Sequence, residues 1–347
     1  MTSVQSRPAE PVTTGAAVSR LLSFSRQFRA AGLVLVLVVL VVATAVANPR
    51  FLSPQGLRDL LLAAALTVLL ATGMTLVILT KGIDLSMGSV LGLSAFGTAT
   101  VLSSNPGLPV VAGAAVGIAI GAACGLVNGA LISLGKVPPL VATLGTLYVF
   151  RGLVYFWAGG SRISAGDMPR GFLGLGTGRI LGIPYLMLIA LLVLVVTGVY
   201  LGRYRAGRDL YAIGSNPEAA ALAGIPIMRR LMWAYVAAGA MAGLGGVLYA
   251  ARFGTVDASA GSGLELDVVA AAVVGGVAIF GGSGTVFGAA LGGLILTVIN
   301  NALPALGIDQ FWQRAIVGAL IIGAIGLDRL VSLRLAASLR RSSSRVR

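Results

Sequence analysis

The stretch Leu57–Leu79 reads LRDLLLAAALTVLLATGMTLVIL and carries no charged residue after Asp59. A helix needs about 20 apolar residues to cross the hydrocarbon core of a bilayer, so this stretch predicts a membrane-spanning helix. The whole chain of 347 residues is 57% hydrophobic and only 10% charged, whereas soluble domains carry about 25% charged residues. These values exclude a soluble enzyme and indicate an all-α polytopic membrane protein.

Similar apolar runs recur along the chain, and their lengths predict about ten membrane-spanning helices. The third and eighth runs are short and rich in small residues, which membrane helices use for close packing. The expected spans are Ala30–Ala47, Leu57–Leu79, Met87–Ser103, Leu108–Leu134, Pro138–Ala158, Pro184–Gly202, Leu231–Ala251, Glu265–Phe280, Thr285–Leu303 and Phe311–Leu327.

Several classes of site are excluded by composition. The chain has no His, and Cys124 is its only cysteine. This excludes His-based catalytic triads, His zinc or haem sites, an internal disulfide and a metal site built from two cysteines. The only lysines are Lys81 and Lys136, and neither lies in the Gly-rich setting of an ATP-binding loop. We expect no enzyme activity, no metal and no cofactor, so the energy source must be another subunit.

The formal net charge of +14 does not indicate nucleic-acid binding, because the basic residues lie in tails and in connections between apolar runs. With the N-terminus inside, 17 Lys and Arg residues fall on the cytoplasmic side and seven outside. The positive-inside rule therefore predicts cytoplasmic termini in a bacterial cytoplasmic membrane, with lipid as a partner. We expect a partly disordered N-terminal tail at 1–29, a membrane domain at 30–327 and a basic tail at 328–347. Ala45-Val46-Ala47 resembles a signal-peptidase site, but the long polar leader and the span-length apolar run disfavour cleavage.

Two pairs of similar short segments indicate an inverted repeat, in which spans two to five correspond to spans seven to ten. Gly82-Ile83-Asp84-Leu85 precedes the third span, and Gly263-Leu264-Glu265-Leu266 opens the eighth. Gly121-Ala122-Ala123 and Gly288-Ala289-Ala290 form a second pair in the fourth and ninth spans. Paired spans lie five apart and so cross in opposite directions, as in many transporters. Such short similarities also arise by chance in a chain this rich in Gly, Ala and Leu, so the alternative of no repeat stays open.

The loop at 203–230 is the longest connection expected on the cytoplasmic side, and it contains its own helix pattern. Asn216 is a typical N-cap residue, Pro217 suits the first helical position, and Glu218 complements the positive end of the helix dipole. Gly224 and Pro226 end the pattern. A helix of about two turns is too short to persist alone in water. It either rests on the bilayer surface or docks into a cytoplasmic partner through Ala219, Ala220, Leu222 and Ala223.

Four motifs, in chain order, resemble those of the ribose-type (carbohydrate-uptake) ABC importer permeases over roughly residues 30–330. They are Gly82-Ile83-Asp84-Leu85-Ser86-Met87-Gly88-Ser89-Val90; Pro139-Leu140-Val141-Ala142-Thr143-Leu144-Gly145-Thr146 followed by Arg151-Gly152; Gly214-Ser215-Asn216-Pro217-Glu218-Ala219-Ala220 with Ala223-Gly224-Ile225; and Gly261-Ser262-Gly263-Leu264-Glu265-Leu266 with Gly275-Gly276 and Gly281-Gly282-Ser283-Gly284. The Thr-Leu-Gly-Thr run and Trp157-Ala158-Gly159-Gly160 look most similar to the rhamnose and autoinducer-2 (Lsr-type) branch. Lys81 departs from the family, where Gly or a small polar residue is common.

The resemblance implies three protein partners: a cytoplasmic ATPase with tandem nucleotide-binding domains, a second identical or sister permease, and a periplasmic or lipid-anchored sugar-binding protein. It also implies that the loop helix couples the chain to the ATPase. The coupling residues are then Ser215, Asn216, Pro217, Glu218, Ala219, Ala220, Leu222, Gly224 and Ile225. The transported solute would be a sugar or sugar-like compound of the ribose, rhamnose, xylose or autoinducer-2 type, and the sequence does not distinguish among these.

A neutral polyol is bound by hydrogen-bonding side chains rather than by a charged pocket. The apolar runs contain several side chains that can form hydrogen bonds. The candidates for the translocation path or gate are Asp84, Ser86, Ser89, Asn128, Thr143, Thr146, Glu265, Asn300 and Asn301. Each has an ordinary structural alternative, because an amide or hydroxyl within a span often bonds a neighbouring helix. Asp84, Glu265 and Asp267 equally suit helix caps.

An ion-coupled secondary transporter of a small polar solute is the alternative function. Such a carrier usually needs an intramembrane carboxylate or His on its relay. The absence of His and of a clearly central acid counts against this alternative.

Overall fold

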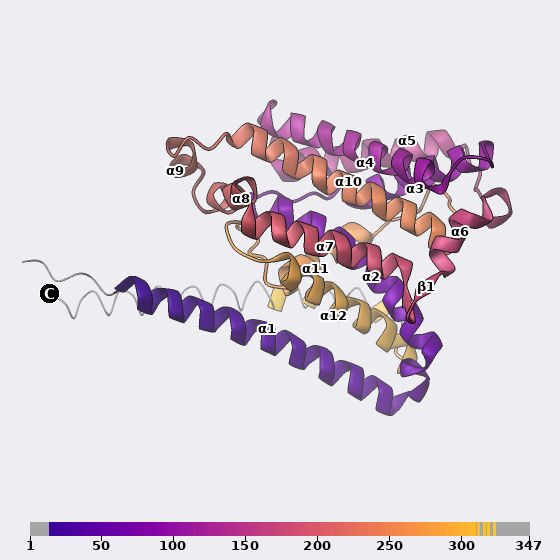
Figure 1. The fold of residues 1–347 in the computed structure, drawn as a ribbon, viewed down its shortest axis with the longest axis horizontal. Coiled ribbons are helices and arrows are strands. Elements are labelled where there is room, and N and C mark those ends of the chain that lie inside the picture. The colour runs from indigo at the N-terminus through magenta and orange to yellow at the C-terminus, as the bar shows by residue number, and fades with distance from the viewer. Residues whose placement is uncertain (1–13, 310, 313–314, 317, 320–321, 324–347) are drawn as a thin grey trace, which may run out of the picture.

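The computed structural model describes residues 14–309, 311–312, 315–316, 318–319 and 322–323. Its long helices lie roughly side by side in one bundle (Figure 1). The helices are α1 (Thr14–Ala47), α2 (Pro54–Ile78), α3 (Met87–Ser104), α4 (Val110–Ser133), α5 (Pro139–Ala158), α6 (Arg170–Thr177), α7 (Tyr185–Arg203), α8 (Arg205–Ser215), α9 (Pro217–Leu222), α10 (Ile227–Phe253), α11 (Leu264–Val274) and α12 (Val286–Ala305). Two 3₁₀ turns, η1 (Pro49–Leu52) and η2 (Ala165–Asp167), and a hairpin of β1 (Arg179–Ile180) and β2 (Ile183–Pro184) complete the described elements.

Seven of the described helices are long and apolar enough to cross a membrane, namely α2, α3, α4, α5, α7, α10 and α12. They confirm an all-α polytopic membrane protein, but they do not confirm the count of ten. The first expected span corresponds to a shorter apolar segment, Ala31–Ala47, within α1. The tenth, Phe311–Leu327, falls largely outside the described residues.

The eighth expected span, Glu265–Phe280, is a helix only as far as Val274. At about 1.5 Å per residue, the 11 residues of α11 are about 16 Å long and cannot cross a bilayer as a helix. Gly275 and Gly276 follow directly, and Gly276 has a φ of 92°, which favours glycine and ends the helix. The prediction of one continuous helix here was wrong, because the apolar run continues through residues that cannot propagate it.

Helix α10 lies at the centre of the bundle, where it packs against α2, α3 and α4. Its contact with α4 is made by glycines: a Cβ atom at Gly121 would collide with the backbone of Gly239 and Gly243, and one at Gly125 with the carbonyl of Tyr235. Glycines let two membrane helices approach through their backbones. The Gly-rich composition therefore determines which helix surfaces pack most closely.

Two non-helical segments enter the bundle before short helices. Residues 79–86 precede α3, and residues 254–263 precede α11. Backbone without helix at membrane depth is tolerated only where protein buries it, and both segments have buried residues, among them Asp84, Val256 and Ala260. The start of α3 packs on the second segment and on the start of α11: a Cβ atom at Gly88 would collide with the Gly261 carbonyl and the Glu265 carboxylate.

The two ends of the bundle differ. Helices α8 and α9 project from one end, and α9 forms its tip (Figure 1). Helix α6 and strand β1 lie at the opposite end (Figure 1). The sequence predicted one short helix in the 203–230 loop; the structure adds a second, α8, which comes directly after α7.

Candidate functional site: a buried polar cluster, a second cavity and an interhelical joint

Five of the predicted pathway residues meet in a single buried cluster, which we call the Asp84 cluster. It consists of Asp84, Ser86, Asn128, Thr143 and Thr146, each less than 9% exposed. The residues come from the 79–86 segment, from α4 and from α5. The tertiary fold thus brings together side chains that are up to 62 positions apart in the sequence.

Hydrogen bonds connect most of these side chains to one another. The backbone N–H and the hydroxyl of Ser86 donate to Asp84 Oδ1 at 2.9 and 2.6 Å. Asn128 Nδ2 donates to Ser86 Oγ at 2.8 Å, and Thr146 Oγ1 donates to Asn128 Oδ1 at 2.7 Å. Thr143 Oγ1 lies 3.0 Å from the carbonyl of Ile83. The cluster therefore ties the segment before α3 to α4 and α5.

The charge of Asp84 has no cationic partner, since no Lys or Arg in the described part of the chain forms an ion pair with it. The Tyr235 hydroxyl, on α10, is also buried and without a hydrogen-bond partner among the described residues. This hydroxyl lies beside Gly82, where a Cβ atom would collide with it. A buried carboxylate is costly and marks a functional site by default.

The remaining predicted pathway residues lie elsewhere. Ser89 is buried in the first turn of α3. Glu265 accepts a hydrogen bond from Gly263 N at 3.3 Å, at the start of α11, and its carboxylate packs on Gly88. Asn300 and Asn301 lie in α12, on a separate cavity of about 180 Å³ between α2, α10, α11 and α12. The predicted pathway residues therefore fall into at least two sites.

Arg151 was quoted only as part of a motif, and the structure shows its contacts. It lies in α5, is 9% exposed, and donates through Nη1 to the carbonyls of Ala258 at 3.0 Å and Ala260 at 2.7 Å. It thereby fastens the non-helical segment before α11 to α5. An arginine within an apolar run must find acceptors, so its position in the sequence could have identified it as an anchor.

An exposed acid in the same segment is also ordered by local bonds. Asp257 Oδ1 accepts hydrogen bonds from the hydroxyl of Ser259 at 2.6 Å and from its backbone N–H at 2.7 Å. These bonds hold the Asp257 side chain against the backbone of its own segment.

The predicted loop helix is confirmed as α9. Asn216 Oδ1 accepts from Ala219 N at 3.0 Å, as expected of an N-cap, and Gly224 follows with a φ of 73°. Leu222 is 91% exposed, whereas Ala220 is only 3% exposed. The expectation that Ala220 is exposed is therefore wrong, because α9 packs one side against α8 and α10.

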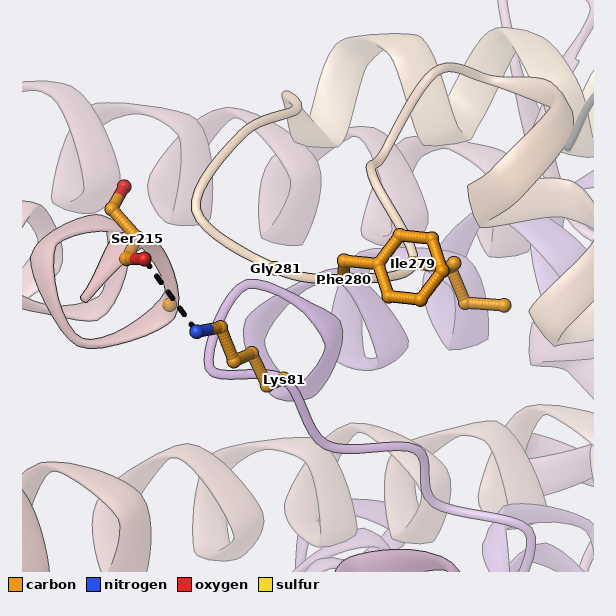
Figure 2. Close-up of a pocket in the computed structure, with 6 residues that line it drawn as sticks. Lys81, Ser215, Ile279, Phe280 and Gly281 are labelled. Carbon is orange, nitrogen blue, oxygen red and sulfur yellow. Dashed lines mark hydrogen bonds between the residues drawn. The ribbon is translucent and has the colours of Figure 1, made fainter. Parts of the chain in front are cut away.

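The end of α8 makes a close-packed joint with the two connections at this end of the bundle, 79–82 and 278–284. Gly214 leaves no room for a Cβ atom, because the Leu79 carbonyl and the backbone of Gly282 lie against it. Gly282 N donates to the Leu79 carbonyl at 3.0 Å. Figure 2 shows the Lys81 side chain extending toward Ser215, and Lys81 Nζ lies 3.5 Å from the Ser215 carbonyl. Sequence inspection missed this joint, because its parts are far apart in the chain.

Two further contacts fix α8. The Arg230 side chain of α10 forms an ion pair with Asp209 at 2.8 Å. The Tyr211 hydroxyl donates to the Gly284 carbonyl at 3.0 Å. Helix α8 is thus tied to α10 and to the connection before α12, and movement of α9 would be transmitted through it.

Comparison with known proteins gives the family. The family model described as "Branched-chain amino acid transport system / permease component" matches residues 56–325. The ribose import permease protein RbsC of Bacillus subtilis (strain 168) is 39% identical over 293 residues, covering 84% of this chain and 90% of that protein. The galactose/methyl galactoside import permease protein MglC of Salmonella typhimurium is 37% identical, covering 89% and 96%. The autoinducer 2 import system permease protein LsrC of Enterobacter sp. (strain 638) is 37% identical, covering 81% of each chain.

No solved structure matches the chain significantly. The family match covers most of the described helices, from α2 through α12. Relatives named for ribose, galactose and autoinducer 2 have similar identities, so no single branch stands out. This multi-pass membrane protein is a transport component rather than an enzyme, and it belongs to the family of the branched-chain amino acid transport system permease component.

Proposed function

We propose that the chain is the membrane-spanning permease subunit of a binding-protein-dependent ABC importer for a sugar or sugar-like solute. The relatives named for ribose, galactose and autoinducer 2 import support the solute class, which includes ribose, rhamnose, xylose and autoinducer-2 types. Separate ATPase subunits supply the energy, a binding protein delivers the solute, and a second permease completes the membrane unit. The solute itself stays open.

The observation that carries the proposal is the exposure of helix α9, which follows the firmly packed helix α8. Its Leu222 side chain is 91% exposed, while α8 behind it is packed on both connections through Gly214. An apolar side chain at the tip of a short helix suits insertion into a partner groove. The proposed ATPase-coupling residues are accordingly the predicted ones without the buried Ala220, namely Ser215, Asn216, Pro217, Glu218, Ala219, Leu222, Gly224 and Ile225.

The side of the membrane follows from this assignment. The α8–α9 end faces the cytoplasm, both termini are cytoplasmic, and the β1–β2 end faces outward. The inverted repeat is supported by a crosswise pattern of contacts: α4 packs on α10 as α12 packs on α2, and α3 packs on α4 as α11 packs on α12. A tenth span completes the second repeat.

The decisive experiment changes the exposed tip. Leu222→Asp is expected to abolish co-purification of the ATPase and solute uptake, because it places a charge in an apolar contact. Leu181→Asp is the matched control: Leu181 is 97% exposed at the opposite end of the bundle, so ATPase capture is expected to persist. If the Leu222 variant retains both activities at normal membrane levels, α9 is not the docking element.

The ion-coupled transporter is kept as a second candidate because Asp84 is 1% exposed and unpaired by any described cation. A protonophore separates the two functions. With the protonophore present and cellular ATP maintained, an ABC importer continues to take up its solute, whereas a proton-coupled carrier stops. If uptake stops, Asp84→Asn is expected to remove the coupling of solute transport to protons.

A further inference from the structure

The cavity between α2, α10, α11 and α12 is lined by both polar and aromatic side chains. Its polar lining comes from all four helices and includes Thr67, Arg252, Asp267, Thr297, Asn300 and Asn301. Leu66, Leu70 and Val268 supply apolar walls, and Tyr249 and Phe253 supply two aromatic rings. A few convergent polar groups in a mostly apolar recess are the usual composition of a small-molecule site.

One polar atom in this cavity has no partner. Asn300 Oδ1 is buried and accepts no hydrogen bond from any residue that the structure describes. Leaving a buried acceptor unpaired is unfavourable, so such an atom requires an explanation. Its neighbour Asn301 is different, since Asn301 Nδ2 donates to the Thr297 carbonyl at 2.8 Å. Asn300 is therefore the group that a bound molecule would satisfy.

The aromatic rings form one wall. The Tyr249 and Phe253 ring centroids lie 4.5 Å apart, and the Arg252 guanidinium carbon lies 4.7 Å from the Phe253 centroid. Arg252 Nη1 also donates to the Leu62 carbonyl at 3.1 Å, which fixes its direction. An aromatic wall of two tilted rings beside amide, hydroxyl and guanidinium groups suits a ring with C–H faces and hydroxyl edges.

The volume limits the ligand to one small ring. A cavity of about 180 Å³ holds roughly six water molecules at about 30 Å³ each, which is the size of a five- or six-carbon polyol. A second hollow, of about 380 Å³, is lined mostly by apolar side chains of α2, α7, α8 and α10, together with Thr197, Tyr200 and Trp233, and its one charged side chain, Arg230, is already paired with Asp209. That hollow has no carboxamide group among its lining side chains.

We propose that each permease chain carries its own subsite for a neutral, monosaccharide-sized polyol in this cavity, with Asn300 and Tyr249 as ligand-binding residues. The subsite lies within a single chain and away from the Asp84 cluster. Its walls are the middle of α2, the last turn of α10, the first two turns of α11 and the second half of α12. These parts lie away from α8 and α9. They are therefore closer to the outer end of the bundle, where a solute arriving from outside would enter. The inference rests on the proposed function for the direction of transport.

The test uses the full chain in lipid nanodiscs, with Cys124 replaced by Ala. Asn300→Cys is reacted with a small methanethiosulfonate reagent in the presence of D-ribose, D-galactose, D-allose or L-rhamnose. At least one sugar, added at about four times its dissociation constant, is expected to slow labelling by about fivefold, because only the unoccupied fraction of the site reacts. Thr197→Cys, in the apolar hollow, is the matched control and should label at an unchanged rate.

Three results would overturn the subsite: no labelling of Asn300→Cys, no protection by any of the four sugars, or equal protection of Thr197→Cys. Uptake of the same sugars by the complete importer is measured in parallel. If a sugar is taken up but does not protect Asn300→Cys from labelling, the subsite is rejected and the proposed importer function stands. If a sugar protects Asn300→Cys but is not taken up, the subsite stands and the proposed importer function is rejected. In the complete importer, Asn300→Leu should raise the half-saturating sugar concentration by about fivefold, and an unchanged value would contradict the proposal.

Discussion

Single residues fasten the non-helical segments of this bundle in place. Arg151 donates to two backbone carbonyls of the segment before α11, and Ser86 and Asn128 surround Asp84 in the segment before α3. Buried backbone that lacks a helix must find partners in side chains. The polar residues within the spans thus serve first to make these two segments stable at membrane depth.

The anchoring role of Arg151 can be measured. Arg151→Met keeps an unbranched apolar side chain that can replace the aliphatic part of arginine but leaves two buried carbonyls without donors, each at a cost of about 1–3 kcal/mol. The apparent melting temperature in detergent is expected to fall by about 5 °C or more. Arg179→Met, at an exposed position of β1, is the control and should change little. Equal melting temperatures for the two variants would show that Arg151 does not support the segment.

Two lysines adopt a backbone conformation that favours glycine. Lys81 has a φ of 66° and Lys136 a φ of 55°. A side chain in the left-handed region costs roughly 1 kcal/mol relative to Gly. This cost explains why Gly suits position 81, where this chain has Lys and the ribose-type permeases commonly have Gly or a small polar residue. Here the Lys81 side chain instead reaches Ser215.

At the scale of elements, α8 and α9 have different parts in the proposed coupling to the ATPase. Helix α9 presents the exposed contact, and α8 joins it to the connections at 79–82 and 278–284 through Gly214. Bringing backbone against backbone makes the joint stiff, because no flexible side chain lies between the parts. A displacement at the tip would therefore reach the two connections at 79–82 and 278–284.

Filling the joint should separate docking from transmission. Gly214→Ala adds a methyl group against the Leu79 carbonyl, and overpacking of this kind costs about 1–3 kcal/mol. We expect the ATPase to co-purify normally and solute uptake to fall strongly. Gly202→Ala is the control, because a Cβ atom there meets open space within a helix, where Ala is favoured by about 1 kcal/mol. Normal uptake by the Gly214 variant would mean that the joint does not transmit motion.

At the scale of the molecule, crosswise packing joins the two halves. Helix α10 lies against α2, α3 and α4, while α12 lies against α2 and α11. Helices that are far apart in the sequence thus pack together in the core of the bundle. The starts of α3 and α11 meet at Gly88 and Glu265, as expected where discontinuous helices of a transporter converge.

The orientation of the molecule is testable without transport. In a chain with Cys124 replaced, cysteine at Ser215 should react only from the cytoplasmic side and cysteine at Ser161 only from outside. Both positions are exposed, and they lie at opposite ends of the bundle. Impermeant thiol labelling of intact and inverted vesicles measures this directly. Reaction of both positions from one side would contradict the proposed topology.

The sequence by itself determined the class of the protein and the local elements. Apolar length and charge content predicted the membrane helices, and Asn216, Pro217 and Gly224 predicted α9, because helix capping and spanning depend on neighbours within a few residues. The same local reasoning named the side chains of the Asp84 cluster as candidates without showing that they meet.

Tertiary structure alone decided which distant groups come together. It placed Asn128 against Ser86, separated Asn300 from that cluster, turned Ala220 inward and ended α11 at Val274. Periodicity does not reveal such contacts, because in a helix that is apolar on every side the hydropathy pattern marks no inward face. The buried face was decided instead by where glycines such as Gly121 and Gly239 allow two backbones to touch.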